Sequence, residues 1–510
     1  MKFNPLLCTD VYKMSHMTMY APGTTKVYSY LTTRSDKKFK DVMFFGLQYY
    51  LREYLSKPIT PEMGEEFLEV RRSILGSNDP EVTEKIRALC RLGYWPLKIK
   101  AVPEGAVLPV NNVLMTITNT HPDFPWCVGF VESLLLKVWY SCTVATQSLE
   151  YRRTVDEFFD KTVDDSQFHL KPFMVHDFGY RGASDEEGSA VSGAAHLVNF
   201  YGSDTVPAYM FIREYYGGSE IEPIMSSVPA SEHSVMCSYG RGGELDAFRN
   251  ILAKNPTGIV SIVSDTFDVY NVLTTFCETL KEEILGRDGK TVFRPDSGDP
   301  KTIICGDQTG RDTPESLGCL RLLDRMFGHT VNSKGYKVLN EKVGLIYGDG
   351  MYLERYQDIL SRMEEMCYAA SNLVIGVGGI LRNHTRDTMG FAIKATYVEV
   401  NGECREIEKD PVTDPGKKSR KGLLSLSMSE RGWLTTDQVS PDDESSGCLY
   451  DTFIDGEICD GDVRFSDIRS TATVAIRFLR MLRGEWDSSD VKSRVASIAS
   501  GVIDSLVSAG

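Results

Sequence analysis

Polar clusters interrupt the middle of this chain, and they hold the residue types that could do chemistry. Almost every short apolar run there ends in one of them, and in chain order they read HDFGYR, GSDT, ASEH, VSD, RPDSGD, GDG and GVGG. Any one cluster could be an ordinary turn or helix cap, but seven in the same relative position indicate a functional site, since a packed core has no need of them. The candidate side chains are Asp177, Arg181, Asp204, His233, Asp265, Arg294, Asp296 and Asp349.

The arginines and glycines of these clusters indicate an anionic, phosphate-bearing substrate. Guanidinium forks at Arg181 and Arg294 match pairs of phosphate oxygens, and glycine loops at 348–350 and 376–379 would let backbone N–H groups close on them. GVGG is not a dinucleotide fingerprint, because Leu381 stands where the third glycine would be. The neighbouring aspartates could bind ribose hydroxyls or carry a hydrated Mg²⁺, with Asp265 and Asp296 as candidates, or could simply cap strand ends.

His233 lies in the stretch SVPASEHS and is one of only eight histidines. The residue types leave four roles open: metal ligand, general base, nucleophile, or a structural hydrogen-bonded histidine. Metal binding is weakened by the absence of a second ligand at HxH or HExxH spacing.

A repeated order of strand, loop and helix from about residue 170 to 390 must position these residues. GIVSIVSD leads into a helical pattern from Val269, VGLIYGDG leads into one from Leu353, and Ser184 is a plausible N-cap before a third. Such continuous apolar runs are typical of parallel strands buried on both faces, so an α/β barrel or a doubly wound sheet is predicted. In a barrel the loops after the strands share one face, where we expect the candidate residues to converge.

The two flanks of the chain are β-rich. Lys26–Thr32, LKIKAVPEGAVLPV and VLMTITNT favour strands, and EVNGEC, FIDGEI and CDGDV carry hairpin signals. The flanks are therefore predicted to pair as one discontinuous domain, giving boundaries of 1–165, 166–392 and 393–510. Between the barrel region and the last hairpins, Glu408–Gly422 reads as a basic loop.

Composition limits the possible partners and the compartment. The 510 residues are 42% hydrophobic and 25% charged with a net charge of −15, which disfavours nucleic acid and anionic membranes as partners. No apolar stretch reaches about 18 residues, and nothing resembles a signal peptide. The twelve cysteines form no CxxC pair. We expect reduced thiols and a cytoplasmic location.

The order of the motifs resembles the nicotinamide phosphoribosyltransferase family over most of the chain. The matching stretches are TDVYKMSH, KVYSYLTTR, FFGLQYYL, HDFGYRG, GSDTV, PASEHS, RPDSGDP, YGDG, HTRD and KDPVTDPGKKSRKG. The resemblance implies an irregular α/β (TIM-like) barrel with a second, discontinuous β-rich domain, in a two-fold homodimer. It also implies transfer of the phosphoribosyl group of phosphoribosyl pyrophosphate to nicotinamide, giving nicotinamide mononucleotide and pyrophosphate, with Mg²⁺ and coupled ATP hydrolysis.

The same resemblance implies roles around the base. Phe178, which would otherwise read as a core aromatic, matches the residue stacked on one face of the pyridine ring, and Tyr12 of the partner subunit matches the other face. Arg181 matches the arginine near the amide oxygen and phosphate. Asp204 matches the carboxylate that accepts the amide N–H. Nicotinate would set its own carboxylate against Asp204, so nicotinamide is the favoured substrate.

The resemblance implies further roles along the rest of the substrate. His233 matches the histidine that takes a phosphoryl group from ATP, beside Glu232. Asp296 and Gly348 match groups at the ribose, and Asp265 and Asp349 are acidic neighbours. The phosphate-side matches are Ser227, Arg294, Gly378, Gly379, Arg386, Lys394, Lys409, Lys417 and, from the partner subunit, Arg34. The glycine loop is one glycine poorer than is usual in the family, and Ala392 stands where the family often has serine.

Three other readings remain open. A nicotinate phosphoribosyltransferase would share the fold but lacks a reason for Asp204. A binding or signalling protein could keep the fold without catalysis, although the main site residues are intact. A metal-dependent hydrolase on the same barrel would use His176, Asp177, His196 and His233.

Overall fold

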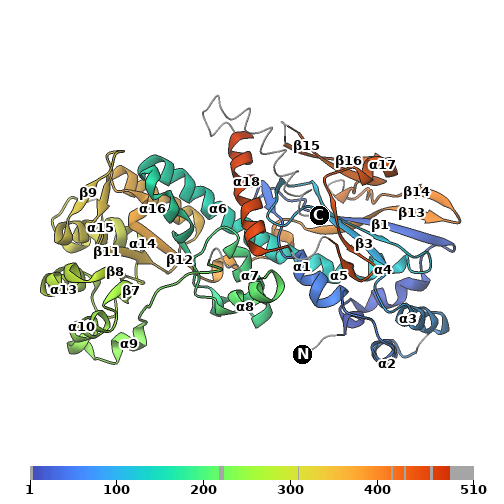
Figure 1. The fold of residues 1–510 in the computed structure, drawn as a ribbon, viewed down its shortest axis with the longest axis horizontal. Coiled ribbons are helices and arrows are strands. Elements are labelled where there is room, and N and C mark those ends of the chain that lie inside the picture. The colour runs from blue at the N-terminus through green and yellow to red at the C-terminus, as the bar shows by residue number, and fades with distance from the viewer. Residues whose placement is uncertain are drawn as a thin grey trace. The chain divides into compact units, whose positions relative to one another are not determined.

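The computed structural model describes residues 4–77, 79–217, 223–307, 309–414, 417–429, 432–459 and 463–482. The chain forms two compact units (Figure 1). The discontinuous unit comprises Met1–Thr146, Ile212–Ser219 and His384–Gly510, and the barrel unit comprises Gln147–Phe211 and Glu220–Asn383. The domain boundaries expected from the sequence stay predictions. Among the described residues, no helix has both the length and the apolar character to cross a membrane.

A seven-stranded antiparallel sheet forms the centre of the discontinuous unit. Strands from the later part of the chain flank the three early strands on both sides, because β1 pairs with β13 as well as with β5, and β3 pairs with β17. The predicted discontinuous β-rich domain is thereby confirmed. In sheet order the strands are β14 (Glu403–Glu406), β13 (Ala392–Val400), β1 (Thr24–Thr32), β5 (Val113–Asn119), β3 (Leu97–Ala101), β17 (Tyr450–Ile454) and β18 (Glu457–Ile458).

Two of the three predicted hairpins are present in this sheet. Asn401 and Gly402 turn β13 into β14, and Asp455 and Gly456 turn β17 into β18, all four with positive φ as a tight hairpin turn requires. The third, at CDGDV, lies outside the described residues. The short sheets are β2 (Asp41–Met43) with β4 (Val107–Pro109) and β15 (Leu423–Ser429) with β16 (Gly432–Val439).

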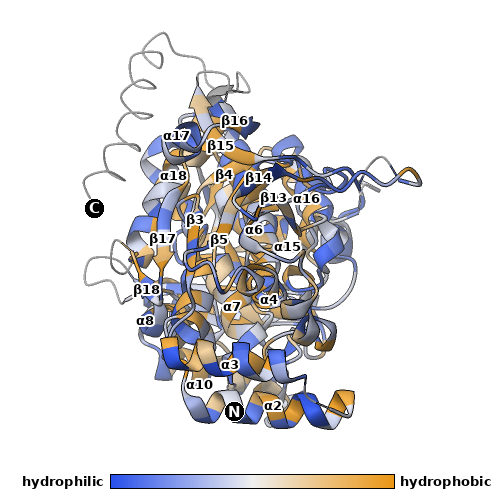
Figure 2. Cartoon of the chain, turned by 90° about the vertical axis from the view of Figure 1, so that its right-hand side faces the viewer, coloured by the Kyte–Doolittle hydropathy of each residue, from blue (hydrophilic) through white to orange (hydrophobic). Residues whose placement is uncertain are grey.

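Helices α2 and α3 of the discontinuous unit each bury one face. In α3 the buried residues Val82, Ile86 and Leu89 recur at helical spacing, and Figure 2 shows α2 and α3 with both hydrophilic and hydrophobic residues. The helices are α1 (Leu47–Tyr50), α2 (Pro61–Leu75), α3 (Pro80–Leu92), α4 (Trp126–Phe130), α5 (Glu132–Leu135), α17 (Pro441–Ser445) and α18 (Phe465–Leu482). Helices α6 (Trp139–Thr162) and α8 (Val206–Tyr215) each contain residues of both units.

The barrel unit is built on a five-stranded parallel sheet. Isolated parallel bridges, Ala230 to Ser261, Gly202 to Ser226 and Ser203 to Asp177, continue the curl from β7 back to β6. The predicted irregular α/β barrel is confirmed. The strands in order are β6 (Val175–Asp177), β12 (Leu373–Val377), β11 (Val343–Tyr347), β8 (Asp288–Arg294) and β7 (Thr257–Val263).

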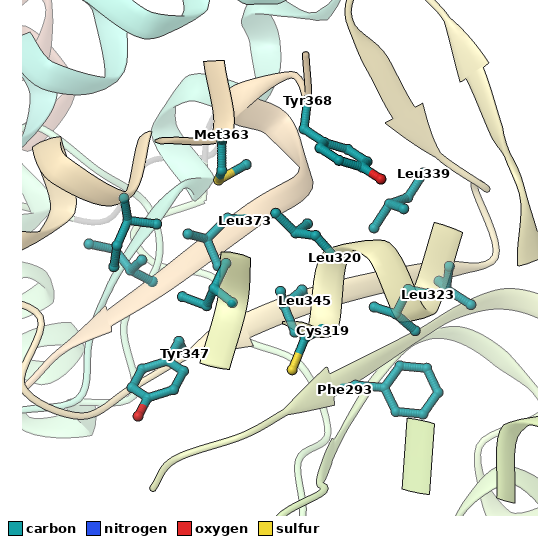
Figure 3. Packing of buried hydrophobic residues seen from close by; sticks show 14 of the residues in the cluster. Phe293, Cys319, Leu320, Leu323, Leu339, Leu345, Tyr347, Met363, Tyr368 and Leu373 are labelled. Atoms are coloured by element: carbon teal, nitrogen blue, oxygen red, sulfur yellow. The ribbon is translucent and has the colours of Figure 1, made fainter. Parts of the chain in front are cut away.

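Helices cover the outer face of this sheet. Leu345 and Leu373 from the strands pack with Leu320, Leu323 and Met363 from two helices (Figure 3). The helices are α7 (Glu186–Leu197), α9 (His233–Cys237), α10 (Glu244–Lys254), α11 (Val269–Asn271), α12 (Cys277–Thr279), α13 (Lys281–Gly286), α14 (Pro300–Cys305), α15 (Pro314–Phe327) and α16 (Leu353–Glu365); a π-helical turn, Val272–Phe276, joins α11 to α12. A hairpin of β9 (His329–Val331) and β10 (Lys337–Leu339) follows α15.

The predicted N-cap of α7 was wrong by one residue. Asp185, not Ser184, accepts the hydrogen bond of the Gly188 N–H. The Ser184 hydroxyl instead donates to the Asp185 carboxylate at 2.6 Å. A carboxylate also complements the helix dipole better than a hydroxyl does.

Candidate active site

The start of α9 and the carboxyl ends of β7 and β8 bring the four predicted catalytic residues together. His233 begins α9, and its Nε2 lies 3.2 Å from Oδ1 of Asp265. The other oxygen of Asp265 accepts the backbone N–H of Asp296 at 2.9 Å. The His233 side chain is 47% exposed while Asp265 is 6% exposed, so a buried carboxylate orients an accessible imidazole.

Arg294 and Asp296 form the next part of the same cluster. Nη2 of Arg294 lies 3.2 Å from Oδ2 of Asp296. Nε of Arg294 and Oδ1 of Asp296 are buried and have no hydrogen-bond partner among the described residues. Buried polar groups are nearly always satisfied, so these two atoms are candidates for contact with a ligand.

Phe178 lies where β6, β8, β11 and β12 end. Its backbone N–H donates to the carbonyl of Val377 at 3.0 Å, and the Arg294 guanidinium lies 5.2 Å from its ring centre. Glycines make room for the ring, because a Cβ on Gly376 would lie 2.0 Å from the Phe178 Cδ2. A Cβ on Gly348 would lie 3.1 Å from Oδ1 of Asp296 and 3.2 Å from the same ring carbon. The Phe178 ring, the Arg294 guanidinium and the Asp296 carboxylate are thus close neighbours, and we call this cluster the base slot.

Asp204 lies in the segment that bridges β6, and it is exposed. The hydroxyl of Ser227 donates to its Oδ1, so Ser227 contacts the base-side carboxylate in this structure. The backbone N–H of Asp204 donates to the carbonyl of Asp177 at 3.0 Å, which ties this segment to the strand that carries Phe178.

The glycine loop packs against the loop that carries Arg181. Arg181 is exposed in the short turn Tyr180–Gly182. A Cβ on Gly182 would lie 2.6 Å from Cα of Gly379, while one on Gly378 would meet nothing within 4 Å. The backbone at Gly378 therefore faces open space, as a phosphate-binding loop requires. Asp349 is exposed on the neighbouring loop, where Arg355 donates to the carbonyl of Gly350 at 2.8 Å.

Asp177 was expected at the mouth of the barrel and is instead fully buried. Both of its carboxylate oxygens bind the guanidinium of Arg382, at 2.7 Å each. The sequence analysis missed Arg382. Its one signal was a charged residue within the apolar run after the glycine loop, and nothing there identifies a partner 205 residues away.

The residues proposed for a hydrolase are not arranged for metal binding. His196 is buried, with Nδ1 3.0 Å from the hydroxyl of Ser148 and Nε2 3.2 Å from the carbonyl of Val175. Burial lowers the pKa of His196 to about 4, so it is neutral. Within the described ranges, no three His, Cys, Asp or Glu side chains are gathered to hold a metal ion.

The remaining predicted residues lie in the discontinuous unit. Burial lowers the pKa of Lys394, and the nearby charges of Arg34, Lys409 and Arg386 lower it further, against an opposing effect of Glu132. The backbone N–H of Arg34 donates to the carbonyl of Met389 at 3.0 Å, and its Nε donates to Gly390 at 3.4 Å. Four cations thus lie close enough to repel one another, an arrangement that favours an anion.

Lys417 and Tyr12 are more exposed members of this unit. Lys417 forms an ion pair with Asp414 at 2.9 Å on the surface. Tyr12 is 60% exposed, and its ring contacts that of His16 edge-on at 4.9 Å.

Two family models match the chain. The nicotinate phosphoribosyltransferase (NAPRTase) family model matches residues 173–453, and the model of the nicotinamide phosphoribosyltransferase N-terminal domain matches residues 4–77. The first covers the barrel site and most of the later strands.

Curated relatives are similar along most of their length. The nicotinamide phosphoribosyltransferase of Acinetobacter baylyi is 41% identical, covering 90% of this chain and 95% of that protein. Those of Xanthomonas campestris pv. campestris and Mycoplasma pneumoniae are 42% and 33% identical, covering 83% and 82% of this chain and 87% and 94% of theirs.

Solved structures agree in fold. A nicotinate-nucleotide pyrophosphorylase from Pyrococcus furiosus matches with a TM-score of 0.56 at 15% identity, covering 93% of this chain and 96% of that one. The human nicotinic acid phosphoribosyltransferase matches with a TM-score of 0.54 at 17% identity, covering 92% and 94%.

Proposed function

Because this chain belongs to the nicotinate phosphoribosyltransferase family, we propose that it transfers the 5-phosphoribosyl group of phosphoribosyl pyrophosphate to nicotinamide. The products are nicotinamide mononucleotide and pyrophosphate, and the role is salvage of nicotinamide for NAD. One observation carries the choice of base. Asp204 accepts a hydrogen bond from Ser227 and lies beside β6, the strand that Phe178 directly follows. Its carboxylate would accept a hydrogen bond from the N–H of an amide and would repel a second carboxylate.

The barrel supplies positioning and electrostatic stabilisation. The bond from ribose C1 to pyrophosphate breaks largely before the pyridine nitrogen attacks, so positive charge grows on the ribose and negative charge on the leaving group. In the proposed complex the carboxylates of Asp296 and Asp265, which lie together, would face the ribose, while Arg294 and the 378–379 backbone would face phosphate. The pyridine nitrogen carries no proton to remove, so no general base is needed.

His233 is the proposed acceptor of a phosphoryl group from ATP. Its Nε2 faces Asp265, so that nitrogen holds the proton and Nδ1 keeps the lone pair for attack. A bond forms between Nδ1 and the γ-phosphorus as the bond to ADP breaks, and Asp265 stabilises the resulting cationic imidazole. Hydrolysis of the phosphohistidine returns the histidine.

The acidic residues of the barrel fit a hydrated Mg²⁺ bound together with the substrate. Asp265 has both oxygens in hydrogen bonds, whereas Oδ1 of Asp296 has no partner in the described part of the chain. This donor set suits an ion that keeps most of its waters and takes further ligands from diphosphate, not an all-protein cage. When bound, Mg²⁺ would neutralise charge on the leaving pyrophosphate.

The proposal includes a cytoplasmic homodimer with shared sites. Tyr12 of the partner subunit would close the base slot opposite Phe178, and Arg34 of the partner subunit would reach the phosphates. The exposure of Tyr12, with Val11 at 38% and Met19 at 69%, supports a covering partner.

The test is a direct assay of both bases. Purified protein is incubated with phosphoribosyl pyrophosphate, Mg²⁺ and either nicotinamide or nicotinate, with and without ATP, and the mononucleotides are separated by chromatography. We expect nicotinamide mononucleotide, formed faster with ATP. A preference for nicotinate would overturn the substrate, and no product from either base would favour a protein that only binds.

A further inference from the structure

The Asp177–Arg382 ion pair is the most deeply buried charged contact around the base slot. The two side chains are 0% and 2% exposed, and two parallel bonds of 2.7 Å join them. Removing two charges from water costs free energy that the pair's attraction offsets only with such geometry, and stability alone rarely requires it. Stability alone therefore does not explain why the chain buries this ion pair.

The pair connects the segments that form the base slot. The hydroxyl of Thr205 donates to Asp177 at 2.7 Å and accepts from Arg382 at 3.3 Å. The N–H of Gly179 donates to Asp177 at 2.8 Å. Asp177 and Gly179 flank Phe178, and Thr205 directly follows Asp204, so one ion pair holds both base-contacting residues through their neighbours.

Arg382 adds the glycine loop to this connection. It follows the turn Gly379–Leu381, and a Cβ on Gly179 would lie 1.9 Å from its Nη1. Only glycine at this position lets the guanidinium pass that close to the chain.

The pair also sets the charge beneath the slot. Burial alone would raise the pKa of Asp177, but the hydrogen bond and charge of Arg382 outweigh it, and the pKa lies below its usual value. Asp177 and Arg382 are therefore both ionised and cancel each other. The titratable neighbours His196 and His176 are kept neutral by burial, which lowers the pKa of each.

We propose that Asp177 and Arg382 form a specificity-determining pair: they hold Phe178 and Asp204 in register and keep the floor of the slot neutral. The pair then adds no net charge of its own, so Asp204 chooses between an amide and a carboxylate on the pyridine ring. Both members are positioning residues, and the inference rests on the proposed transfer to nicotinamide.

Opposite single substitutions test the electrostatic part. Asp177→Asn leaves the Arg382 cation uncompensated and should raise the ratio of nicotinate to nicotinamide turnover about tenfold. Arg382→Gln leaves the Asp177 anion and should lower the same ratio. Both bases are supplied in competition, and the two mononucleotides are separated and quantified by chromatography with mass detection.

The double variant Asp177→Asn with Arg382→Gln tests the positioning part. It restores neutrality without the ion pair, so the base preference should return toward that of the unmodified protein while the KM for nicotinamide stays raised and kcat changes less. If circular dichroism shows that the single variants do not fold, the double variant alone tests the inference. An unchanged KM for nicotinamide in the double variant would overturn it.

A purely structural role predicts a different result. Both single variants would then lose activity on the two bases in parallel. A ratio of nicotinate to nicotinamide turnover that stays unchanged in both variants, or that shifts in the same direction in both, would overturn the inference. Failure of the proposed function is separate, because it would appear as absent nicotinamide turnover in the unmodified protein.

Discussion

At the scale of single residues, neighbouring carboxylates of this site have different tasks. Asp177 is buried and neutralised by Arg382, whereas the Asp204 side chain is exposed and accepts a hydrogen bond from Ser227. Asp265 orients His233 through one oxygen and anchors the loop of Asp296 through the other. Residue type alone does not separate these roles, but burial and partners do.

Asp204→Asn should relax the discrimination between the two bases. The amide side chain of this variant is neutral and no longer repels the carboxylate of nicotinate, so the ratio of kcat/KM for nicotinamide over nicotinate should fall roughly tenfold or more. Steady-state kinetics with each base measure it. An unchanged ratio would remove Asp204 from the specificity role.

His233→Ala should abolish ATP hydrolysis and leave some transfer that does not depend on ATP. The imidazole is the proposed phosphoryl acceptor, while Phe178 and Asp204 stay in place. Release of phosphate from ATP and formation of mononucleotide are measured on the same sample. His169→Ala is the matched control, since that exposed ring contacts only the carbonyl of Ser166 among the described residues and should leave both rates unchanged. Survival of the ATP stimulation in His233→Ala would contradict the assignment.

At the scale of elements, the barrel strands separate two environments. Their outer faces pack on α15 and α16 (Figure 3), while Gly376 in β12 leaves room for Phe178. The polar clusters follow the strands because the chain leaves the sheet there and its N–H groups become available for ligands.

Gly376→Ala should displace Phe178 and weaken base binding. A methyl group at this position would lie 2.0 Å from the ring, a distance that forces the ring out of the slot. We expect the KM for nicotinamide to rise about tenfold with a smaller effect on that for phosphoribosyl pyrophosphate. Gly344→Ala is the control, because its methyl would meet only milder contacts, with the Lys290 side chain and with Cγ2 of Val292, both at 3.3 Å. Equal effects of the two substitutions on base binding would refute this explanation.

The β9–β10 hairpin should lose stability in acid. Burial acts to raise the pKa of Asp324, but hydrogen bonds from Tyr368, His329 and Lys337, together with the nearby charge of His329, lower the pKa overall. Because the pKa of Asp324 is lower in the folded protein than in the unfolded chain, where it is about 3.9, the ionised carboxylate stabilises the fold at pH values above about 3.9. This contribution to the free energy of unfolding is lost as the pH falls through the pKa of the folded protein.

Asp324→Asn should therefore lower the melting temperature most near neutral pH, with a difference that shrinks below about pH 4. Thermal unfolding across pH measures it. Asp312→Asn, which loses only an exposed pair with Arg325, is the control and should change little. A constant difference down to acid pH would show that Asp324 is not ionised in the way described.

At the scale of the whole molecule, the chain leaves and re-enters its first unit. Strands β13 and β17 return to pair with β1 and β3, so the basic cluster around Lys394 forms on a sheet made from both ends of the chain. The basic cluster around Lys394 therefore belongs to the discontinuous unit, and the base slot belongs to the barrel unit.

The proposed shared sites predict complementation between two defective chains. Tyr12→Ala and Phe178→Ala should each be nearly inactive as homodimers. A heterodimer purified through two different tags has one site with both aromatics intact and should show about half of the normal activity. A monomer by light scattering, or a heterodimer no more active than its parents, would contradict the shared site.

The sequence by itself determined the elements and the reaction class. Strand runs, hairpin turns at Asn401 and Asp455 and the order of polar clusters follow from local periodicity and turn chemistry, which depend on near neighbours. Only the tertiary structure decided which polar residue meets which. Asp177 and Arg382 lie 205 residues apart, and no local pattern records that one neutralises the other. Burial and long-range pairing thus made Asp177 a support, left Asp204 and His233 accessible, and gave His196 two structural hydrogen bonds.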